Sequence, residues 1–420
     1  MIAGLLRFLP LLAHKHWPRE RLEELRRAKL RRLIDHAYRH VPYYRRLMDS
    51  AGVSPAEIRE TADLVRLPVT TKQDLRAAGA DALATGHGPL QTVHTSGHSG
   101  IPFVVHVSAA EDSLRNLRDF RFLLGIGLRA RDRVTYLGPA FVPPDRLYRR
   151  LGLYRLDAIP LTLGPAEQLR RLRLARPDVL WAYPSILQGL LTQAGCPLSR
   201  IAHPRSLVSS SEVMQPKLFH ELRADRPDLD IVNTYASIEV GRIAAECRVR
   251  RGLHLEDDAQ IVELLDPHGV PVEPGRQGSV VVTCLDQFAM PFIRYEQGDL
   301  CRLLPGSCAC GWSTPRMDLP LGRTHDMLAL PDGTCISPHG IVTELRAEQD
   351  LLQYRFVQER RDRVRAQLCF RLPPSPERLA GLRERMERIV EGRVRVDIEL
   401  VPEIQFEGRK FRPFISRISA

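Results

Sequence analysis

Apolar residues recur at helical spacing near the start of the chain. The stripe contains Leu22, Leu25, Leu33 and Ile34, with Ala28 and Ala37 between them. A period of three to four residues is typical of an amphipathic helix, so we predict a helix over about residues 18–39. The Val41-Pro42 step should end it, because the residue before a proline disfavours helical backbone.

Between about residues 90 and 300, short β-rich runs alternate with helical stretches. The runs begin at Val134, Asp178, Ser206 and Ile231. This alternation predicts a layered α/β domain with a mostly parallel sheet. A more antiparallel patch follows, with one run from Ile261, a turn at residues 267–269 and a second run from Gly278.

The pattern changes after Gly322. Runs from Tyr354 and Val364 predict a hairpin, Ser375-Pro376 begins an amphipathic helix, and a last strand starts at Val394. We therefore expect an α/β protein with a large layered domain over residues 1–322 and a small α+β domain over residues 323–420.

The composition is that of an ordinary globular protein, with 420 residues, of which 44% are hydrophobic and 26% charged. The apolar opening stretch, residues 1–13, is short and carries Arg7, so we expect no signal peptide and no membrane span. Eight cysteines without a secretion signal argue against a disulfide framework. We expect a cytoplasmic protein with reduced thiols or a metal site.

The net charge of +11 is compatible with a nucleic-acid binder, whose basic residues would gather on one face. Here arginines are interleaved with acids, as in residues 18–36, which is typical of a solvated helix face. We expect no nucleic-acid partner, and the surplus charge could instead attract small anions such as nucleotides. The chain has 56 arginines and five lysines, namely Lys15, Lys29, Lys72, Lys217 and Lys410.

A loop rich in glycine and hydroxyl residues follows the run at residues 91–94. It contains Thr95, Ser96, Gly97, His98, Ser99 and Gly100. Backbone N–H groups and hydroxyls in such a loop can converge on a phosphate. A polar hairpin turn between two strands is the alternative, and the loop alone does not decide between them.

Other motifs follow in order along the chain. Residues 233–239 end a strand-like run, where ligands gather in open α/β sheets, and they offer an aromatic ring and a carboxylate. The later stretches are RYEQGD from Arg294, GRTHD from Gly322 and GRKFR from Gly408.

Together these motifs resemble the adenylate-forming superfamily, which contains acyl-coenzyme A synthetases, firefly luciferase and nonribosomal peptide adenylation domains. The closest resemblance is to the branch with phenylacetate:coenzyme A ligases and capsule-biosynthesis adenylating proteins. It rests on TSGHSGIP from Thr95, YASIE from Tyr235, the EC and GLH pieces from Glu246 and Gly252, MPFIRYEQGD from Met290, CACG from Cys308, GRTHDM from Gly322 and GRKFR from Gly408.

The resemblance implies ATP-dependent activation of a carboxylic acid, aromatic or otherwise compact, as an acyl-adenylate. Transfer to a thiol or amine would follow, with CoA, a carrier protein or a small amine as acceptor. The C-terminal domain would rotate about a hinge at His325 between the two steps. ATP, Mg²⁺ and CoA would be the implied cofactors.

The resemblance also implies roles for individual residues. Thr95 to Gly100 would cover the ATP phosphates, and the nucleotide would further contact Ser211, Glu212, Tyr235, Ala236, Ser237, Asp299 and Arg323. Asp299 would take the ribose hydroxyls, since a carboxylate accepts two hydrogen bonds. Glu239 would hold Mg²⁺, and Lys410 would reach the reacting carboxylate and the α-phosphate. Tyr136 and Phe141 are suggested as walls of the acid pocket.

Several positions depart from the family pattern. Ile238 replaces a threonine whose hydroxyl would contact the α-phosphate, and Ala236 replaces a glycine. Further departures are Ile101, His325 and Arg409. They motivate a second hypothesis: an ATP-binding relative that joins a non-carboxylate or nitrogen species, or a non-catalytic nucleotide-binding partner.

A thiol and imidazole set could bind a second metal. Cys247, His254, Cys308 and Cys310 supply three sulfurs and one nitrogen, which suit a closed tetrahedral zinc site. The spacing matches no standard zinc finger, and unrelated reduced cysteines are the alternative. The resemblance favours structural zinc, and we expect the remaining cysteines to lie in the core, namely Cys196, Cys284, Cys301, Cys335 and Cys369.

Overall fold

A computed structural model shows how the chain folds. It describes residues 10–94, 103–138, 152, 155–320, 328–332, 335–336 (backbone only), 341, 345, 348, 350–390, 392–404 and 414–418. The chain forms two compact units, each made of two stretches of sequence. The first unit comprises Met1–Gly127 and Thr234–Leu319, and the second comprises Leu128–Asn233 and Pro320–Ala420.

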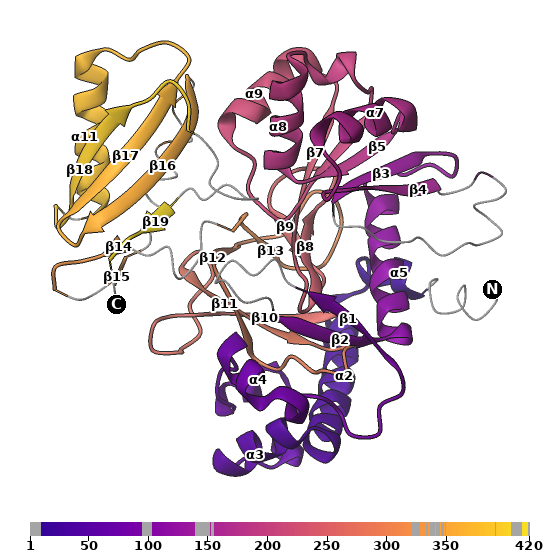
Figure 1. Ribbon diagram of the computed structural model, residues 1–420. Helices are drawn as coiled ribbons and strands as arrows, with labels where there is room; N and C mark the ends of the chain where they lie inside the picture. The colour runs from indigo at the N-terminus through magenta and orange to yellow at the C-terminus, as the bar shows by residue number, and fades with distance from the viewer. Residues whose placement is uncertain are drawn as a thin grey trace. The chain divides into compact units, whose positions relative to one another are not determined.

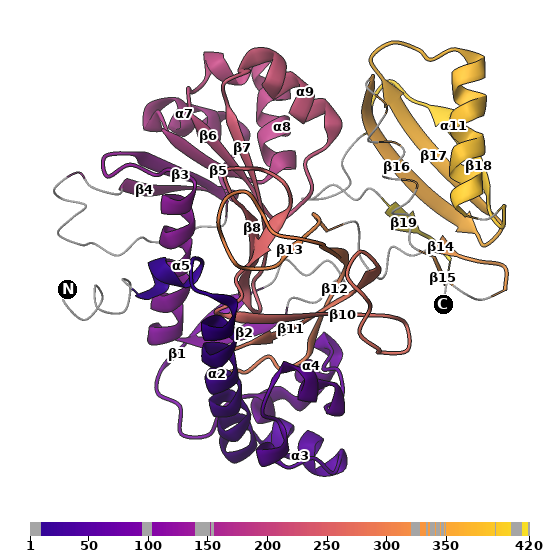
Figure 2. The same cartoon turned by 180° about the vertical axis from the view of Figure 1, so that it is seen from behind.

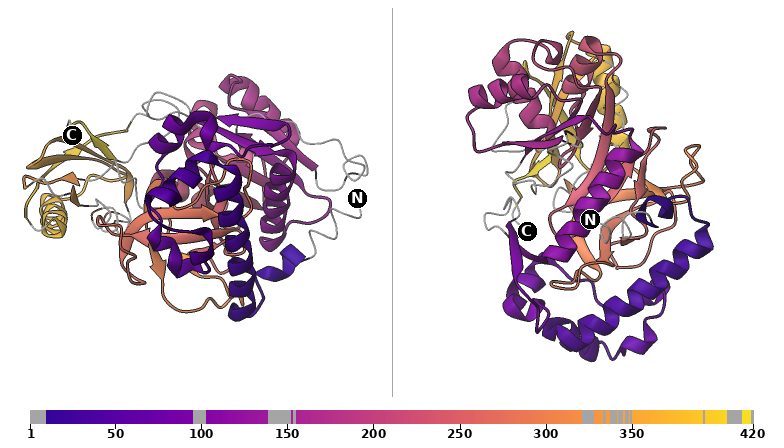
Figure 3. Two further views of the ribbon diagram at one scale, coloured as in Figure 1. Left: turned by 90° about the horizontal axis from the view of Figure 1, so that it is seen from below. Right: turned by 90° about the vertical axis from the view of Figure 1, so that its right-hand side faces the viewer.

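Helices form the amino-terminal part of the first unit. The predicted helix over residues 18–39 is confirmed as α2, Arg19–His40, and α3, Pro42–Ser50, begins directly at the proline that ends it. α2 and α3 lie side by side (Figure 3). Two further helices follow, namely α4, Lys72–Ala78, and α5, Ala109–Gly125. Each of them begins with a capping box.

The sheet of the first unit is antiparallel. Its strands are β8, Gly241–Glu246; β9, Leu253–Leu255; β10, Gln260–Leu265; β11, Gln277–Cys284; β12, Tyr295–Leu304; and β13, Arg316–Met317. They lie in the order β10-β11-β12-β13-β9-β8, and the end of β7, Asp230–Ser237, pairs with β8. A separate hairpin joins β1, Leu90–His94, to β2, Val104–Ser108. The predicted antiparallel patch is thereby confirmed.

The second unit contains the predicted parallel sheet. Its order is β7-β6-β5-β3-β4, with β3, Arg133–Gly138; β4, Arg155–Pro160; β5, Val179–Ala182; and β6, Ser206–Ser209. Alternate strand residues such as Leu180 and Ala182 join a core with three helices. The helices are α7, Pro165–Ala175; α8, Pro184–Ala194; and α9, Pro216–Asp225 (Figure 1).

The C-terminal segment forms a small α+β module. β16, Leu351–Arg360, and β17, Arg363–Phe370, make the predicted hairpin. β18, Arg395–Leu400, and β19, Phe414–Ser416, extend it in parallel on either side, and α11, Pro376–Ile389, packs on the sheet (Figure 2). A short pair, β14, Leu328–Ala329, with β15, Cys335–Ile336, precedes the module.

The predicted fold class is confirmed, since a large mixed sheet with helices accompanies a smaller α+β sheet. Parallel pairing among the described strands of the large sheet is confined to the second unit. The boundary predicted at residue 322 stays a prediction, because residues 321–327 lie outside the described part of the chain. None of the described helices has the length and apolar character needed to span a membrane.

Candidate functional site

Glu239 lies in the turn between β7 and β8, and its buried carboxylate meets two donors. Lys72 Nζ lies 3.0 Å from Glu239 Oε1, and the Tyr295 hydroxyl donates to the same oxygen at 3.2 Å. Burial, together with the nearby carboxylate, raises the pKa of Tyr295, so its hydroxyl keeps its proton. We call these three residues the Glu239 cluster.

Backbone pairing explains how Lys72 reaches Glu239. Thr70 forms a bridge with Tyr295, and two backbone hydrogen bonds of 2.9 and 3.0 Å attach Thr70 to β12 and the residue before it. α4 then begins at Lys72, with Thr71 as its N-cap. The first residue of α4 is therefore held beside the strand that carries Tyr295.

Asp299 lies where β12 bulges away from β11. Residues 297–299 of β12 stand opposite the single residue Val280, and Gly298 has a φ of +73°. This left-handed backbone favours glycine, and a bulge re-aims the side chains next to it. The Tyr235 hydroxyl donates to Asp299 Oδ2 at 2.7 Å.

A second irregularity shapes the end of β7. The pairing of β7 with β8 shifts register between Tyr235 and Ala236, so the strand changes direction before the turn. Ser237 Oγ accepts the Val240 N–H at 3.3 Å and closes that turn. The Tyr235 bond therefore connects the end of β7 to Asp299, and Glu239 lies in the turn that follows. The nucleotide contacts implied for these residues, and for Ala236 and Ser237, stay predictions.

Two of the positions that depart from the family pattern lie at the end of β7 and in the turn that follows it. Ala236 is exposed, and Ile238 packs its side chain against the apolar core of the first unit. The carbonyls of Ile238 and Glu239 both accept hydrogen bonds from Arg115 of α5, at 3.1 and 2.7 Å. The apolar side chain at position 238 is therefore accommodated by the core.

Ser211 and Glu212 lie in the second unit, just after β6. Glu212 accepts the Ser185 N–H at 2.9 Å and also the Ser185 hydroxyl, so its carboxylate caps the first turn of α8. Ser211 has a φ of +70°, an uncommon conformation for a residue with a side chain. The nucleotide contacts implied for both residues stay predictions.

Tyr136, suggested as a wall of the acid pocket, belongs to an aromatic group in the second unit. Its ring meets Trp181 edge to face at 5.7 Å and Tyr183 at 6.5 Å. Burial raises the pKa of Tyr136, and so does its hydrogen bond with Tyr183. The Trp181 Nε1–H donates to Ser210 Oγ at 2.8 Å.

Other predicted positions lie outside the described residues and stay predictions. They are Thr95, Ser96, Gly97, His98, Ser99, Gly100, Ile101, Phe141, Arg323, His325, Arg409 and Lys410. The strands before and after the 95–102 loop are antiparallel partners, with His94 opposite Val104. This pairing is compatible with both the phosphate-cradle and the hairpin interpretations.

The four predicted zinc ligands come together in the first unit, and we call them the Cys/His cluster. Their ligand atoms all lie within 4.8 Å of one another. Cys247 Sγ is 3.7 Å from Cys308 Sγ, and Cys310 Sγ is 3.4 Å from His254 Nε2. Strand pairing explains the assembly, because β9 carries His254 between β8 and β13.

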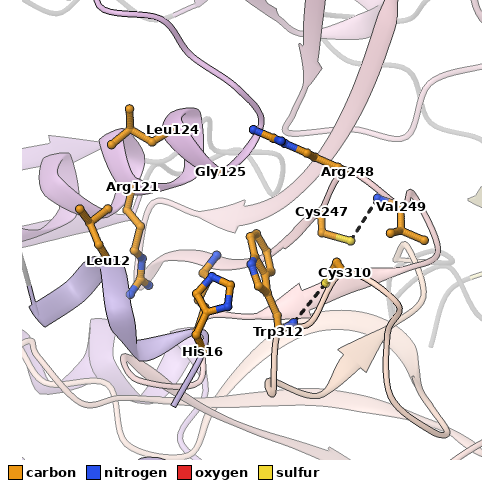
Figure 4. Close-up of a pocket in the computed structure, with 11 residues that line it drawn as sticks. Leu12, His16, Arg121, Leu124, Gly125, Cys247, Arg248, Val249, Cys310 and Trp312 are labelled. Atoms are coloured by element: carbon orange, nitrogen blue, oxygen red, sulfur yellow. Dashed lines mark hydrogen bonds between the residues drawn. The ribbon is translucent and has the colours of Figure 1, made fainter.

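Neighbouring groups orient the cluster. His254 Nδ1 lies 3.1 Å from the Thr314 carbonyl oxygen, an acceptor, so Nδ1 carries the proton and Nε2 is left for a ligand. Burial lowers the pKa of His254 to about 4, which keeps the imidazole neutral. Backbone N–H groups of Val249 and Trp312 donate to two of the sulfurs (Figure 4).

A cavity of about 430 Å³ opens beside two of these thiols. Lys15 contributes to its wall. Trp312 and Arg121, labelled in Figure 4, do so as well. Lys15 Nζ lies 4.2 Å from the centre of the Trp312 ring, and it also pairs with Glu256 at 3.1 Å. The amino-terminal segment is thereby fixed next to the loop that holds the Cys/His cluster.

This chain is similar over most of its length to curated enzymes. It is 31% identical to a phenylacetate-coenzyme A ligase of Thermus thermophilus over 358 residues, which cover 82% of this chain and 80% of that protein. It is 32% identical to a phenylacetate-coenzyme A ligase of Escherichia coli over 74% of this chain and 73% of that protein. The chain belongs to the phenylacetate-coenzyme A ligase family. No family model matches it.

Solved structures agree with this family at the level of the fold. A 2-hydroxyisobutyryl-CoA ligase in the postadenylation state, in complex with R3-HIB-AMP, gives a TM-score of 0.76 at 21% identity, over 96% of this chain and 91% of that one. An open conformation of that ligase, in complex with 2-HIB-AMP and CoA, gives 0.70 at 21% identity, over 96% of this chain and 93% of that one. The adenylate-forming fold expected from the motifs is therefore confirmed.

The sequence motifs did not identify three residues that contact Glu239 or its turn. Lys72, Tyr295 and Arg115 all contact Glu239 or its turn, yet none stood out as a site residue. The scarcity of lysine drew attention to Lys72 as one of five positions. Tyr295 lies inside the RYEQGD motif, whereas Arg115 had no signal among 56 arginines.

The five cysteines expected in the core divide into three groups. Cys284, Cys301 and Cys369 are buried, as predicted. Cys196 is half-buried and packs against the apolar cluster of the second unit, just after α8. The Cys335 side chain lies outside the described part.

Proposed function

We propose that the protein is an ATP-dependent ligase that activates a carboxylic acid as an acyl-adenylate and transfers the acyl group to CoA. A carboxylate oxygen attacks the α-phosphorus of ATP, and the bond to pyrophosphate breaks. The CoA thiolate then attacks the acyl carbon, and AMP leaves. The observation that supports this most is the Glu239 cluster, in a chain of the phenylacetate-coenzyme A ligase family whose Tyr235 also bonds Asp299.

The donor set fits Mg²⁺. Glu239 offers a carboxylate oxygen, and Mg²⁺ is commonly held by one or two carboxylates, water and substrate phosphates. When bound, the ion would neutralise charge that develops on the phosphates. Lys72 now balances the charge of Glu239 through Oε1, so a cation that binds at this oxygen would replace the ammonium group. Asp299 would accept hydrogen bonds from the ribose hydroxyls, while the Tyr235 hydroxyl donates to its Oδ2.

Residues outside the described part complete the proposal. Thr95 to Gly100 would cover the phosphates, and Arg323 would lie near the ribose. Lys410 would supply the cation at the reacting oxygens. Rotation of the C-terminal domain about His325 would separate the two half-reactions. ATP and CoA are cytoplasmic reactants, which accords with the location expected from the sequence.

The acid is proposed to be compact, with aromatic acids as the first choice. Curated relatives are named for phenylacetate, and the group around Tyr136 offers aromatic walls. Acid-dependent exchange of labelled pyrophosphate into ATP, run with phenylacetate, benzoate and 2-hydroxyisobutyrate, tests the first step. Loss of free CoA thiol tests the second. Exchange with none of a broad acid panel, despite ATP binding, would favour the altered-chemistry hypothesis.

We also propose that the Cys/His cluster holds a structural Zn²⁺. In a tetrahedral site with Zn–S bonds near 2.3 Å, two sulfurs stand about 3.8 Å apart and a sulfur and a nitrogen about 3.5 Å apart. The measured separations are 3.7 Å for Cys247 and Cys308, and 3.4 Å for Cys310 and His254. Three thiolates and one imidazole leave no open position for a substrate, so the ion would hold the loop in place.

Metal analysis of protein purified without chelator tests the zinc proposal. We expect about one zinc per chain, and a variant with Cys308→Ser and Cys310→Ser should lose both the zinc and much of its stability. Cys196→Ser is the matched control, since Cys196 is outside the cluster. Equal zinc content in all three proteins would refute the site.

A further inference from the structure

Arg115 lies beneath the turn that carries Glu239. It comes from α5, and its half-buried side chain contacts the 237–241 turn and Gln287, which lies just after β11. Gly241 has a φ of +76°, and a side chain added there would meet the Arg115 stem at 3.7 Å. The turn and the arginine are thus packed directly against each other.

The guanidinium of Arg115 donates three hydrogen bonds to neutral oxygens. Nη1 donates to Ile238 O at 3.1 Å, and Nη2 donates to Glu239 O at 2.7 Å and to Gln287 Oε1 at 2.5 Å. Two consecutive carbonyls of the turn are therefore held by one planar group. A guanidinium presents its donors in a fixed fork, so it sets the direction of both carbonyls.

The two arginines that follow on α5 make different contacts. Arg118 pairs with Asp286, and Arg121 pairs with Glu256 and Asp258. Burial lowers the pKa of Arg115 whereas nearby carboxylates raise the pKa of Arg118. A guanidinium held by neutral oxygens lacks the charge compensation that a carboxylate gives, and a helix that needed only packing would not require it.

We propose that Arg115 is a positioning residue for Glu239. By fixing the carbonyls of residues 238 and 239, it fixes the direction in which the Glu239 side chain leaves the backbone, toward Lys72 and Tyr295. The inference rests on the proposed function of Glu239 at Mg·ATP.

Substitutions of two neighbouring arginines of α5 test this role. Arg115→Lys keeps a cation but loses the fork, and Arg118→Lys is the matched control on the same helix. Calorimetry with Mg·ATP gives binding without turnover. We expect Arg115→Lys to weaken Mg·ATP binding about 10- to 100-fold, as the loss of a group that orients a metal ligand does. Arg118→Lys should lower the unfolding midpoint and leave this affinity unchanged.

A double variant separates positioning from a merely structural role. If Arg115 acts through Glu239, adding Arg115→Lys to Glu239→Gln should weaken Mg·ATP binding no further. Losses that multiply in the double variant would overturn the proposal, as would an Arg115→Lys protein that loses stability with unchanged affinity. If no acid supports pyrophosphate exchange but Arg115→Lys still weakens Mg·ATP binding, the proposed reaction fails and the positioning role stands.

Discussion

Two lysine–glutamate pairs of nearly equal length lie in the first unit, and they occur in very different surroundings. Lys15 Nζ is 3.1 Å from Glu256, and Lys72 Nζ is 3.0 Å from Glu239. The Lys15 and Glu256 side chains are 5% and 0% exposed, whereas Lys72 is 40% exposed and Glu239 is 7% exposed. Distance alone therefore does not distinguish the two pairs.

Their partners explain the difference. Glu256 is also bonded by the buried Arg121, which binds Asp258 as well, and Lys15 is covered by Trp312. If any side chain of this network moved away, its partner would be left as an unpaired buried charge. Lys72, in contrast, can swing into solvent while Glu239 keeps the Tyr295 hydroxyl. We infer that the first pair stabilises the fold and that the second is built to exchange its cation.

The largest effect on stability is expected from Glu256→Gln. The change leaves Lys15 without its carboxylate and removes one partner of Arg121, so the free energy of unfolding should fall by about 3–5 kcal/mol. Chemical denaturation measures it. Glu60→Gln, which removes an exposed pair with Arg27, is the control and should cost little. Equal losses in both variants would remove the contrast between buried and exposed pairs.

Glu239→Gln should have the largest effect on the reaction. The amide keeps the shape of the side chain and can still bond Tyr295, but it offers the metal no charge. Pyrophosphate exchange should fall about 10²- to 10³-fold, since charge stabilisation of the transition state contributes several kcal/mol. Glu296→Gln on β12, whose carboxylate accepts from the Ser279 hydroxyl at 3.4 Å, is the control. Near-normal exchange in Glu239→Gln would assign the carboxylate a structural role.

Tyr235→Phe should have an intermediate effect. The ring stays in place, but Asp299 loses a hydrogen bond of 2.7 Å, and a bond to a charged group contributes about 1.5 kcal/mol or more. We expect the KM for ATP to rise about tenfold, with a smaller rise for 2′,3′-dideoxy-ATP. Tyr38→Phe, which loses a bond to the exposed Asp49, controls for the hydroxyl itself. The same rise for both nucleotides would refute a role through the ribose.

Lys72→Met should have the smallest effect on stability. An ion pair with one partially exposed member contributes at most about 1 kcal/mol, so the unfolding midpoint should move little. Lys15→Met, measured alongside, should be clearly more destabilising because it breaks a buried network. Equal destabilisation of the two variants would contradict the inferred difference between the two pairs.

Local patterns predicted the elements well. The apolar stripe from Leu22 predicted α2 almost to its ends, and Ser375-Pro376 marked the start of α11 because capping chemistry acts within one turn. The motif order also indicated Tyr235, Glu239 and Asp299, and Tyr235 and Asp299 are bonded to each other next to the bulges of β7 and β12.

Contacts between distant parts of the sequence could not be predicted in the same way. The Cys/His cluster depends on β13, a strand of only two residues, whose pairing with β9 brings the Cys308 loop to His254. Lys72 reaches Glu239 through a single bridge at Thr70, and Arg115 acts from 124 positions away. None of these pairings leaves a periodic pattern, because each depends on one or two residues.

The scarcity of lysine has a practical consequence. Of the four lysines in the described part of the chain, Lys72 is the most exposed at 40%, ahead of Lys217 at 23%, Lys29 at 21% and Lys15 at 5%. An amine-directed reagent would therefore modify few positions, and among those described it should label Lys72 first. Mass spectrometry of the labelled protein, with and without Mg·ATP, would follow nucleotide binding at a native side chain, without an introduced probe.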